Sequence, residues 1–191
     1  MTRLVIMGPQ GSGKGTQAAR VAQALEIPAI STGDIFRAHI KGDTELGRLA
    51  RSYSDRGELV PDEVTNSMVR DRLAQEDTAG GFLLDGYPRN AAQVVELDAI
   101  LAEHGTALDG VIELEVAEEE LLERLARRAE VEGRTDDTPE GIRRRLAVYH
   151  EQTAPLAQAY ADRGIHAKVA GSGDLDVITA AVLEAVASLK D

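Results

Sequence analysis

Short apolar runs alternate with longer amphipathic stretches along this 191-residue chain. Five runs have the length of strands and are bounded mostly by glycine or polar residues, at 4–7, 27–30, 82–84, 111–116 and 165–169. Stretches of helix length, rich in alanine, leucine, glutamate and arginine, lie at 14–25, 62–76, 90–104, 118–129 and 175–190. This alternation predicts an α/β fold in which a five-stranded parallel sheet carries helices on both faces.

Two segments do not follow the alternation. Residues 31–60 contain helical pieces without a strand, and residues 130–140 (EVEGRTDDTPE) are polar and contain glycine and proline, which is typical of a loop. The carboxyl ends of parallel strands share one edge of a sheet, where ligands usually bind. We expect both segments to be mobile insertions over that edge of a single domain.

Composition and charge narrow the possible classes of protein. The chain has no cysteine, which excludes disulfides, cysteine-bound zinc and a thiol nucleophile, and its four histidines have no metal-binding spacing. A net charge of −12 disfavours nucleic acid and anionic membranes as partners. Because no apolar run has membrane-spanning length and the N-terminus does not resemble a signal peptide, we expect a cytoplasmic protein. A phosphorylated substrate would require a local basic cluster, and seven of the 21 basic residues are arginines between 124 and 145.

The segment 8–16 (GPQGSGKGT), between the first strand and the first helix, has the pattern of a phosphate-binding loop. Its glycines let successive backbone N–H groups point into one concavity, and the helix N-terminus adds a positive dipole end. Lys14 supplies a charge for the β- and γ-phosphates. Gly15 stands where serine or threonine usually follows the lysine, so we expect Thr16 to contact phosphate and a metal to be held mainly by phosphates and water.

Further polar motifs follow the second and third strands. STGDIFR ends at Arg37 and DGYPR ends at Arg89, and both guanidinium groups are planar forks that suit a phosphate, although a lone arginine more often forms a surface ion pair. Asp85 ends an apolar strand at the ligand edge, where it would either hold Mg²⁺ through water or bond its own turn. Gln93 can offer a donor and an acceptor to an adenine edge, or lie on a solvated helix face.

The arginine cluster begins on a predicted helix. Arg124 and Arg128 are one turn apart and share a face, so their charges repel unless an anion or carboxylates lie between them. Four glutamates occupy the start of the same helix, at 118, 119, 120 and 123. Charge counting alone therefore leaves both a phosphate site and a solvated helix open.

Taken in order, these motifs resemble the nucleoside monophosphate (NMP) kinase family, most closely its adenylate kinase branch, from residue 4 to about residue 178. The set comprises the phosphate loop, STGDIFR, GELVPDE at 57–63, DGYPR, the arginine-rich segment and the glycines at 171–173. The resemblance implies a P-loop NTPase-type fold and one domain over 1–191, with a core of 1–30, 61–127 and 138–191, an NMP-binding insertion at 31–60 and a lid at about 128–138. Without cysteine, this lid is similar to that of short-lid members that carry no zinc.

The resemblance also assigns residues to two nucleotides. It implies that ATP is bound by Gly11, Ser12, Gly13, Lys14, Gly15, Thr16, Arg124, Arg128 and Gly173. It implies that AMP is bound by Thr32, Arg37, Glu58, Leu59, Val60, Gly86, Tyr87, Pro88, Arg89, Gln93, Arg134 and Arg145. The implied catalytic charges are Lys14, Arg89, Arg124, Arg128, Arg134 and Arg145, with Asp85 holding Mg²⁺ through water. Asp136 and Asp137 match paired lid aspartates, and Tyr87–Pro88 is a cis peptide in relatives.

The implied reaction is reversible, Mg²⁺-dependent transfer of a phosphoryl group from ATP to AMP, giving two ADP, by a monomer. A loose transition state needs no protein nucleophile, only positioning and charge in a closed site. Two alternatives stay open at this point. Asn90 slightly favours a UMP or CMP kinase, whereas Thr32 and Gln93 favour AMP. A nucleotide-binding switch would lack a second nucleotide site, and the guanine-reading Asn-Lys-x-Asp pattern does not occur in the chain.

Overall fold

The computed structural model describes residues 2–132 and 138–189. Within those residues, five strands form one parallel sheet in the order β2-β3-β1-β4-β5. The strands are β1 (Thr2–Met7), β2 (Ala29–Ser31), β3 (Gly81–Asp85), β4 (Gly110–Glu115) and β5 (His166–Ala170). The predicted α/β architecture is confirmed, although β2 starts two residues later than its apolar run.

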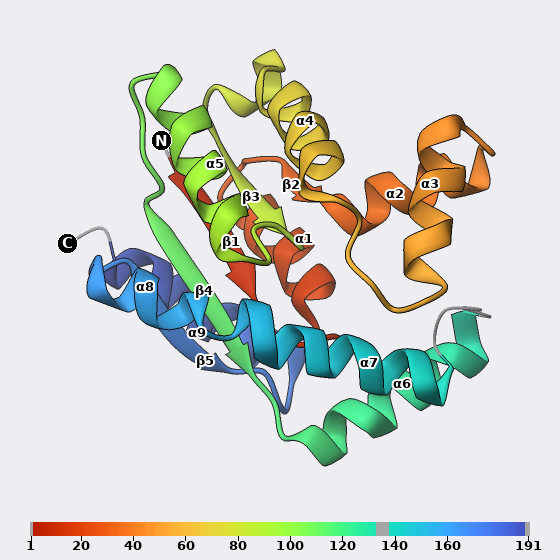
Figure 1. Ribbon diagram of the computed structural model, residues 1–191. Helices are drawn as coiled ribbons and strands as arrows, with labels where there is room; N and C mark the ends of the chain where they lie inside the picture. The colour runs from red at the N-terminus through yellow and green to blue at the C-terminus, as the bar shows by residue number, and fades with distance from the viewer. Residues whose placement is uncertain (1, 133–137, 190–191) are drawn as a thin grey trace.

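Helices cover both faces of the sheet (Figure 1). On one face, α1 (Lys14–Ala24) and α9 (Leu175–Ser188) pack on the β1 side chains Leu4 and Ile6. The opposite face, which includes Val5 and Met7, is covered by α4 (Asp62–Leu73), α5 (Ala91–Glu103) and α8 (Leu156–Asp162). Because both faces are buried, the strands read as continuous apolar runs and not as alternating ones.

Two pairs of helices project beyond the sheet (Figure 1). The insertion at 31–60 contains α2 (Thr32–Lys41) and α3 (Glu45–Ser54), each started by a hydroxyl cap, since Ser31 accepts from the Asp34 amide and Thr44 from the Gly47 amide. The other pair is α6 (Glu118–Glu132) and α7 (Pro139–Val148), whose apolar contact includes Leu125 and Leu146. The helical content predicted for 31–60 is confirmed.

The prediction of a loop at 130–140 is wrong at both ends of that segment. Helix α6 continues through Glu132, and α7 begins at Pro139 behind the Thr138 hydroxyl, which accepts from the Gly141 amide. Proline is suited to the first helical position because its missing N–H has no partner there in any case. Capping by Thr138 therefore starts a helix where the composition indicated a loop.

Several short elements were not predicted from the sequence. They are α7, α8, a 3₁₀ turn at Glu76–Thr78 and a π-helical turn at Tyr149–Thr153 that continues α7 toward α8. None of the helices in the described part of the chain is long and apolar enough to cross a membrane.

Candidate active site

The loop between β1 and α1 folds back on itself around Lys14. Gly11 and Gly13 adopt φ values of 86° and 89°, a region that favours glycine. The Lys14 ammonium donates to the Pro9 carbonyl at 2.9 Å. Gly13 caps α1 and has no side chain, so no side chain of the cap occupies the first amides of α1, an arrangement that suits an anion.

Charged groups from three other segments lie near the Lys14 ammonium. Burial lowers its pKa to about 8, Asp85 opposes this shift, and the positive charges of Arg89 and Arg128 lower the pKa further. These side chains come from the phosphate loop, the end of β3, the turn after β3 and α6. The structure therefore brings near one another four residues that were predicted separately from three motifs, and three of the four are basic.

Asp85 faces the start of α1. A side-chain carbon placed on Gly15 would lie 3.7 Å from Asp85 Oδ2, so the residue after Lys14 points toward the carboxylate and not toward an open loop. A lone carboxylate beside a phosphate loop fits Mg²⁺, which keeps most of its waters and takes few protein ligands. Among the described residues, no three histidine, aspartate or glutamate side chains are grouped in a way that would hold a metal by themselves.

Arg89 is held at its backbone and at its side chain. Its amide donates to Gln93 Oε1 at 2.8 Å, its carbonyl accepts from the Thr153 hydroxyl at 2.7 Å, and its Nε donates to the Gly86 carbonyl at 2.8 Å. Desolvation lowers the pKa of Arg89, and the charges of Arg145 and Arg37 lower it further. A guanidinium fixed in this way is oriented before an anion arrives, which reduces the entropy lost on binding.

The start of α2 packs against the same turn. The buried Thr32 hydroxyl donates to the Gly86 carbonyl at 3.0 Å. A Cβ on Gly86 would approach that hydroxyl to 2.7 Å, and the φ of Gly86 is +83°, so both space and backbone conformation require glycine here. The following peptide, Tyr87–Pro88, is cis, and the Tyr87 hydroxyl donates to Asn66 Oδ1 at 2.8 Å.

Gln93 lies in a polar cluster that sequence reasoning missed. Its Nε2 donates to Asp62 Oδ1 at 2.7 Å, and the Asn90 amide group donates to both Asp62 oxygens at 2.9 and 3.1 Å. The Gln93 side chain is only 2% exposed, so it does not lie on a solvated helix face. The signal for Asp62 was its place in the GELVPDE motif, which was interpreted only through the backbone of Glu58, Leu59 and Val60.

The insertion contributes two further predicted residues. Arg37 is about half exposed and forms an ion pair with Asp34 on the same helix. Glu58 pairs with Arg56 at 2.9 Å and, across the molecule, with Arg144 of α7 at 2.7 Å. Leu59 and Val60 lie in the segment between α3 and α4, and Thr65 donates to the Val60 carbonyl at 3.5 Å.

Arg124 joins three segments near the phosphate loop. It donates to the Gly11 carbonyl at 3.3 Å and to the Gly171 carbonyl at 2.9 Å, and it forms an ion pair with Glu120. Arg145 lies near Arg89, and its Nε donates to the Gly141 carbonyl. The predicted residues Arg134, Asp136 and Asp137 lie outside the described residues.

Sequence similarity to known proteins extends over nearly the whole chain. A family model for adenylate kinase matches residues 6–165. Adenylate kinases of Kocuria rhizophila and Micrococcus luteus are 59% and 57% identical, over 97% and 100% of this chain and 99% and 93% of theirs. That of Thermobifida fusca is 55% identical over 97% of this chain and 98% of its own. The chain belongs to the adenylate kinase family. As an adenylate kinase it is an ATP:AMP phosphotransferase, which confirms the function inferred from the ordered motifs.

Membership of the adenylate kinase family decides between the alternatives that the sequence left open. The switch interpretation fails because adenylate kinase is an enzyme with two nucleotide substrates, and the weak indication from Asn90 toward UMP or CMP is wrong. The structure gives Asn90 a different role, since its side chain starts α5 by accepting from the Gln93 amide at 2.9 Å and also donates to Asp62. Capping of α5 therefore accounts for an asparagine at position 90.

Proposed function

We propose that this adenylate kinase holds the triphosphate of ATP on the phosphate loop and the phosphate of AMP on the Arg89 side of the same cluster. The convergence of Lys14, Asp85, Arg89, Arg128 and Arg145 at the carboxyl edge of β3 and β1 carries this proposal. Phosphoryl groups that enter from opposite sides of such a cluster meet where positive charge is densest. Charge and in-line positioning would then supply most of the rate enhancement.

In this proposal, each residue is assigned a role according to the groups that lie near its side chain. Lys14 and Arg128 would neutralise the ATP phosphates, and Arg89, with Arg145 and Arg37 nearby, would neutralise the phosphate of AMP. Arg124 contacts the phosphate loop through Gly11, which supports a place beside ATP. Gly11, Ser12, Gly13, Gly15 and Thr16 would present backbone or hydroxyl donors to ATP. Thr32, Gly86, Tyr87, Pro88, Gln93 and the backbone of Glu58, Leu59 and Val60 would enclose AMP.

Mg²⁺ would be held by the nucleotide phosphates and by waters that Asp85 orients. When bound, the ion neutralises charge on the phosphate oxygens. Asp85 also raises the pKa of the Lys14 ammonium and thereby favours its charged form. We expect no zinc requirement, because the chain contains no cysteine.

Closure of the site belongs to the same proposal. The insertion at 31–60 and the lid at about 128–138 would move over the nucleotides, exclude water and so prevent transfer of the phosphoryl group to water. The chain provides groups for both nucleotides, so we expect a monomer to be active. Opening of the closed state would then limit turnover, as is common for enzymes with lids.

A coupled assay of ADP formation, with and without AMP and Mg²⁺, tests the proposal. We expect ADP only when ATP, AMP and Mg²⁺ are all present, and a fall in kcat of roughly 10²–10³-fold in Arg89→Ala. Conversion of ATP without AMP that persists in Arg89→Ala would contradict the two-site arrangement. A panel of monophosphates measures how strictly AMP is preferred.

A further inference from the structure

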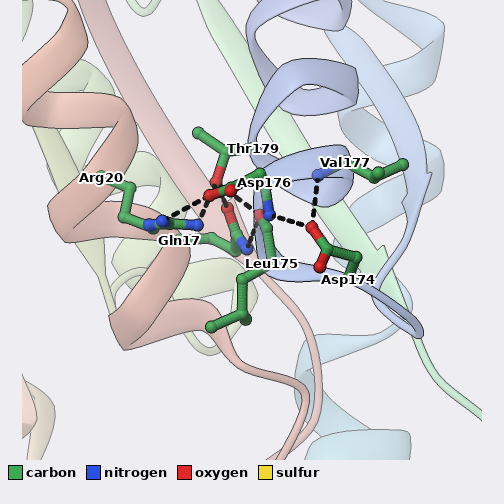
Figure 2. A network of polar contacts seen from close by, with 7 residues as sticks. All are labelled: Gln17, Arg20, Asp174, Leu175, Asp176, Val177 and Thr179. Atoms are coloured by element: carbon green, nitrogen blue, oxygen red, sulfur yellow. Dashed lines mark hydrogen bonds and ion pairs between the residues drawn. The ribbon is translucent and has the colours of Figure 1, made fainter.

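A polar network joins the phosphate-loop helix α1 to the first turn of α9 (Figure 2). Gln17 of α1 donates through Nε2 to the Leu175 carbonyl at 3.2 Å. The Thr179 hydroxyl lies 2.7 Å from both Gln17 Oε1 and the Leu175 carbonyl, and it has one proton to share between them. Gln17 is 1% exposed, and both ends of its buried amide have a partner on α9.

The segment that precedes α9 is fastened to the ATP side of the site at its other end. The Gly171 amide donates to the Glu115 carbonyl at 2.8 Å, and its carbonyl accepts from Arg124 at 2.9 Å. A Cβ on Gly171 would lie 3.2 Å from the Ser12 carbonyl oxygen, so this segment touches the phosphate loop. The Ser172 hydroxyl donates to Glu120 Oε2 at 2.5 Å.

Between these two attachments, Gly173 faces open space with a φ of +110°. Asp174 then caps α9 by accepting from the Asp176 and Val177 amides at 2.8 and 3.3 Å, as Figure 2 shows. The position of the Gly171–Asp174 loop therefore depends on two anchors. Arg124 and Glu115 hold the beginning of the loop at Gly171. Gln17 holds α9, the helix that follows the loop.

We propose that Gln17 is a positioning residue for ATP, which fixes the Gly171–Asp174 loop at the distance from the phosphate loop that an adenosine triphosphate requires. The inference rests on the proposed function and on the assignment of Gly173 to ATP that the family resemblance implies, here beside the adenine. Gln17 lies one helical turn after Gly13, so the helix that presents amides to the phosphates also places the loop beside the base. Triphosphate and base are thereby located by one rigid element.

The test variant is Gln17→Leu, which keeps an apolar stem and removes both polar ends. We expect the KM for ATP to rise roughly 5–10-fold, in line with the loss of one or two buried hydrogen bonds, while the KM for AMP and kcat stay within about twofold. The inhibition constant of inorganic tripolyphosphate, which has no base, should not change. A structural defect of the phosphate loop would weaken ATP and tripolyphosphate alike and would overturn the proposal.

Asp176→Asn is the matched control. It removes the ion pair between Arg20 and Asp176, 2.6 Å long and 37% and 83% exposed, which joins the same two helices at the surface. We expect ATP binding in this variant to equal that of the unaltered chain. If Gln17→Leu does not fold, Thr179→Val removes one of the two contacts, that to Gln17 Oε1, together with a bond from Arg20 to the Thr179 hydroxyl. It should shift the KM for ATP in the same direction by a smaller factor, because the bond from Gln17 Nε2 to the Leu175 carbonyl remains.

The outcomes separate the inference from the proposed function. ADP formation by the unaltered chain and by Asp176→Asn, with an unchanged KM for ATP in both Gln17→Leu and Thr179→Val, would overturn the role of Gln17 and leave the proposed function intact. A lower melting temperature in Gln17→Leu without a change in the KM for ATP would show a merely structural role. Failure of the unaltered chain to form ADP would instead overturn the proposed function.

Discussion

At the scale of single residues, Lys14 combines function with a cost to folding. Burial lowers its pKa from 10.5 to about 8, so its charged form is disfavoured in the folded chain. Below pH 8 the residue is charged in both the folded and the unfolded state, and its desolvation destabilises the fold. Between about pH 8 and 10.5 the folded chain binds fewer protons, so this penalty decreases as pH rises. In the proposed function, activity requires the opposite condition, because only the charged form attracts phosphate.

We therefore expect kcat/KM for ATP to decrease about tenfold per pH unit above pH 8, with one proton lost. At saturating ATP the triphosphate stabilises the ammonium, so kcat should stay constant to a higher pH. Steady-state kinetics from pH 6.5 to 10 measure both quantities. Lys14→Arg is the control, since a guanidinium stays charged and should remove the alkaline decrease. An alkaline decrease of equal size in Lys14→Arg would exclude Lys14 as its source.

Two buried tyrosines offer a matched comparison of stability. The Tyr160 side chain is fully buried, and its hydroxyl has no hydrogen-bond partner within the described part of the chain, whereas the Tyr87 hydroxyl donates to Asn66. We expect Tyr160→Phe to stabilise the chain by about 1 kcal/mol, because it removes an unsatisfied polar group, and to raise the melting temperature by ~2–4 °C. Tyr87→Phe should lower the melting temperature by a similar amount, because it removes a hydrogen bond. Calorimetry of both variants tests this, and a destabilised Tyr160→Phe would show that its hydroxyl has a partner.

At the scale of elements, the sequence predicted the large repeated features and missed the short ones. The strands were found because both faces of the sheet are buried, which makes their sequences continuous apolar runs. The long helices were found because their amphipathic pattern repeats over several turns. Helix α7 was missed because its start depends on one capping threonine in a polar stretch, and the π-helical turn has no sequence pattern. Arg89 was predicted from its motif, but its support by Thr153 was not, since 64 residues separate the two.

The junction of α4 and α5 contains such long-range contacts on the proposed AMP side. Asp62 accepts three hydrogen bonds from Asn90 and Gln93, and Gln93 in turn accepts from the Arg89 amide. We expect Asp62→Ala to destabilise the chain by about 1–3 kcal/mol and to raise the KM for AMP, with little effect on the KM for ATP. Thermal unfolding and initial rates measure these effects.

Glu63→Ala is the control for that junction. Glu63 is an exposed acid in the same first turn of α4, so its loss changes the helix-dipole interaction without touching Gln93. Equal effects of the two substitutions would show that charge at the helix start matters and that the hydrogen-bonded cluster does not.

At the scale of the whole molecule, the sequence predicted which segments lie over one edge of the sheet but not how those segments touch. The motif order placed the insertion and the arginine-rich segment on one edge of the sheet, and Figure 1 shows both pairs of helices projecting from the core. The contact between Glu58 and Arg144 had no sequence signal, because 86 residues separate the partners and both carry ordinary surface charges. The resemblance assigned Arg145 to AMP and gave no role to Arg144.

The ion pair between Glu58 and Arg144 leads to a quantitative prediction about closure of the site. Glu58 and Arg144 are 33% and 55% exposed, so their pair contributes about 0.2–1 kcal/mol. If the pair favours the arrangement in which both nucleotides are enclosed, Glu58→Gln and Arg144→Gln should each weaken binding of a bisubstrate dinucleoside pentaphosphate by roughly 1.5–5-fold. The double variant should be no weaker than either single one, because the same interaction is lost. Faster opening should also raise kcat where opening limits turnover.

Arg56→Gln provides the matched control. Arg56 pairs with the same Glu58 carboxylate as Arg144 does, but it lies in the same segment of the chain as Glu58 and not on α7. Its loss should leave dinucleotide affinity unchanged, because no contact between the insertion and α7 is broken. Salt provides a second comparison, since screening of an exposed pair at high ionic strength should bring the unaltered chain close to the two single variants. Calorimetric titration at low and high salt measures all of these affinities. Additive losses in the double variant would mean that Glu58 and Arg144 act on closure through separate partners.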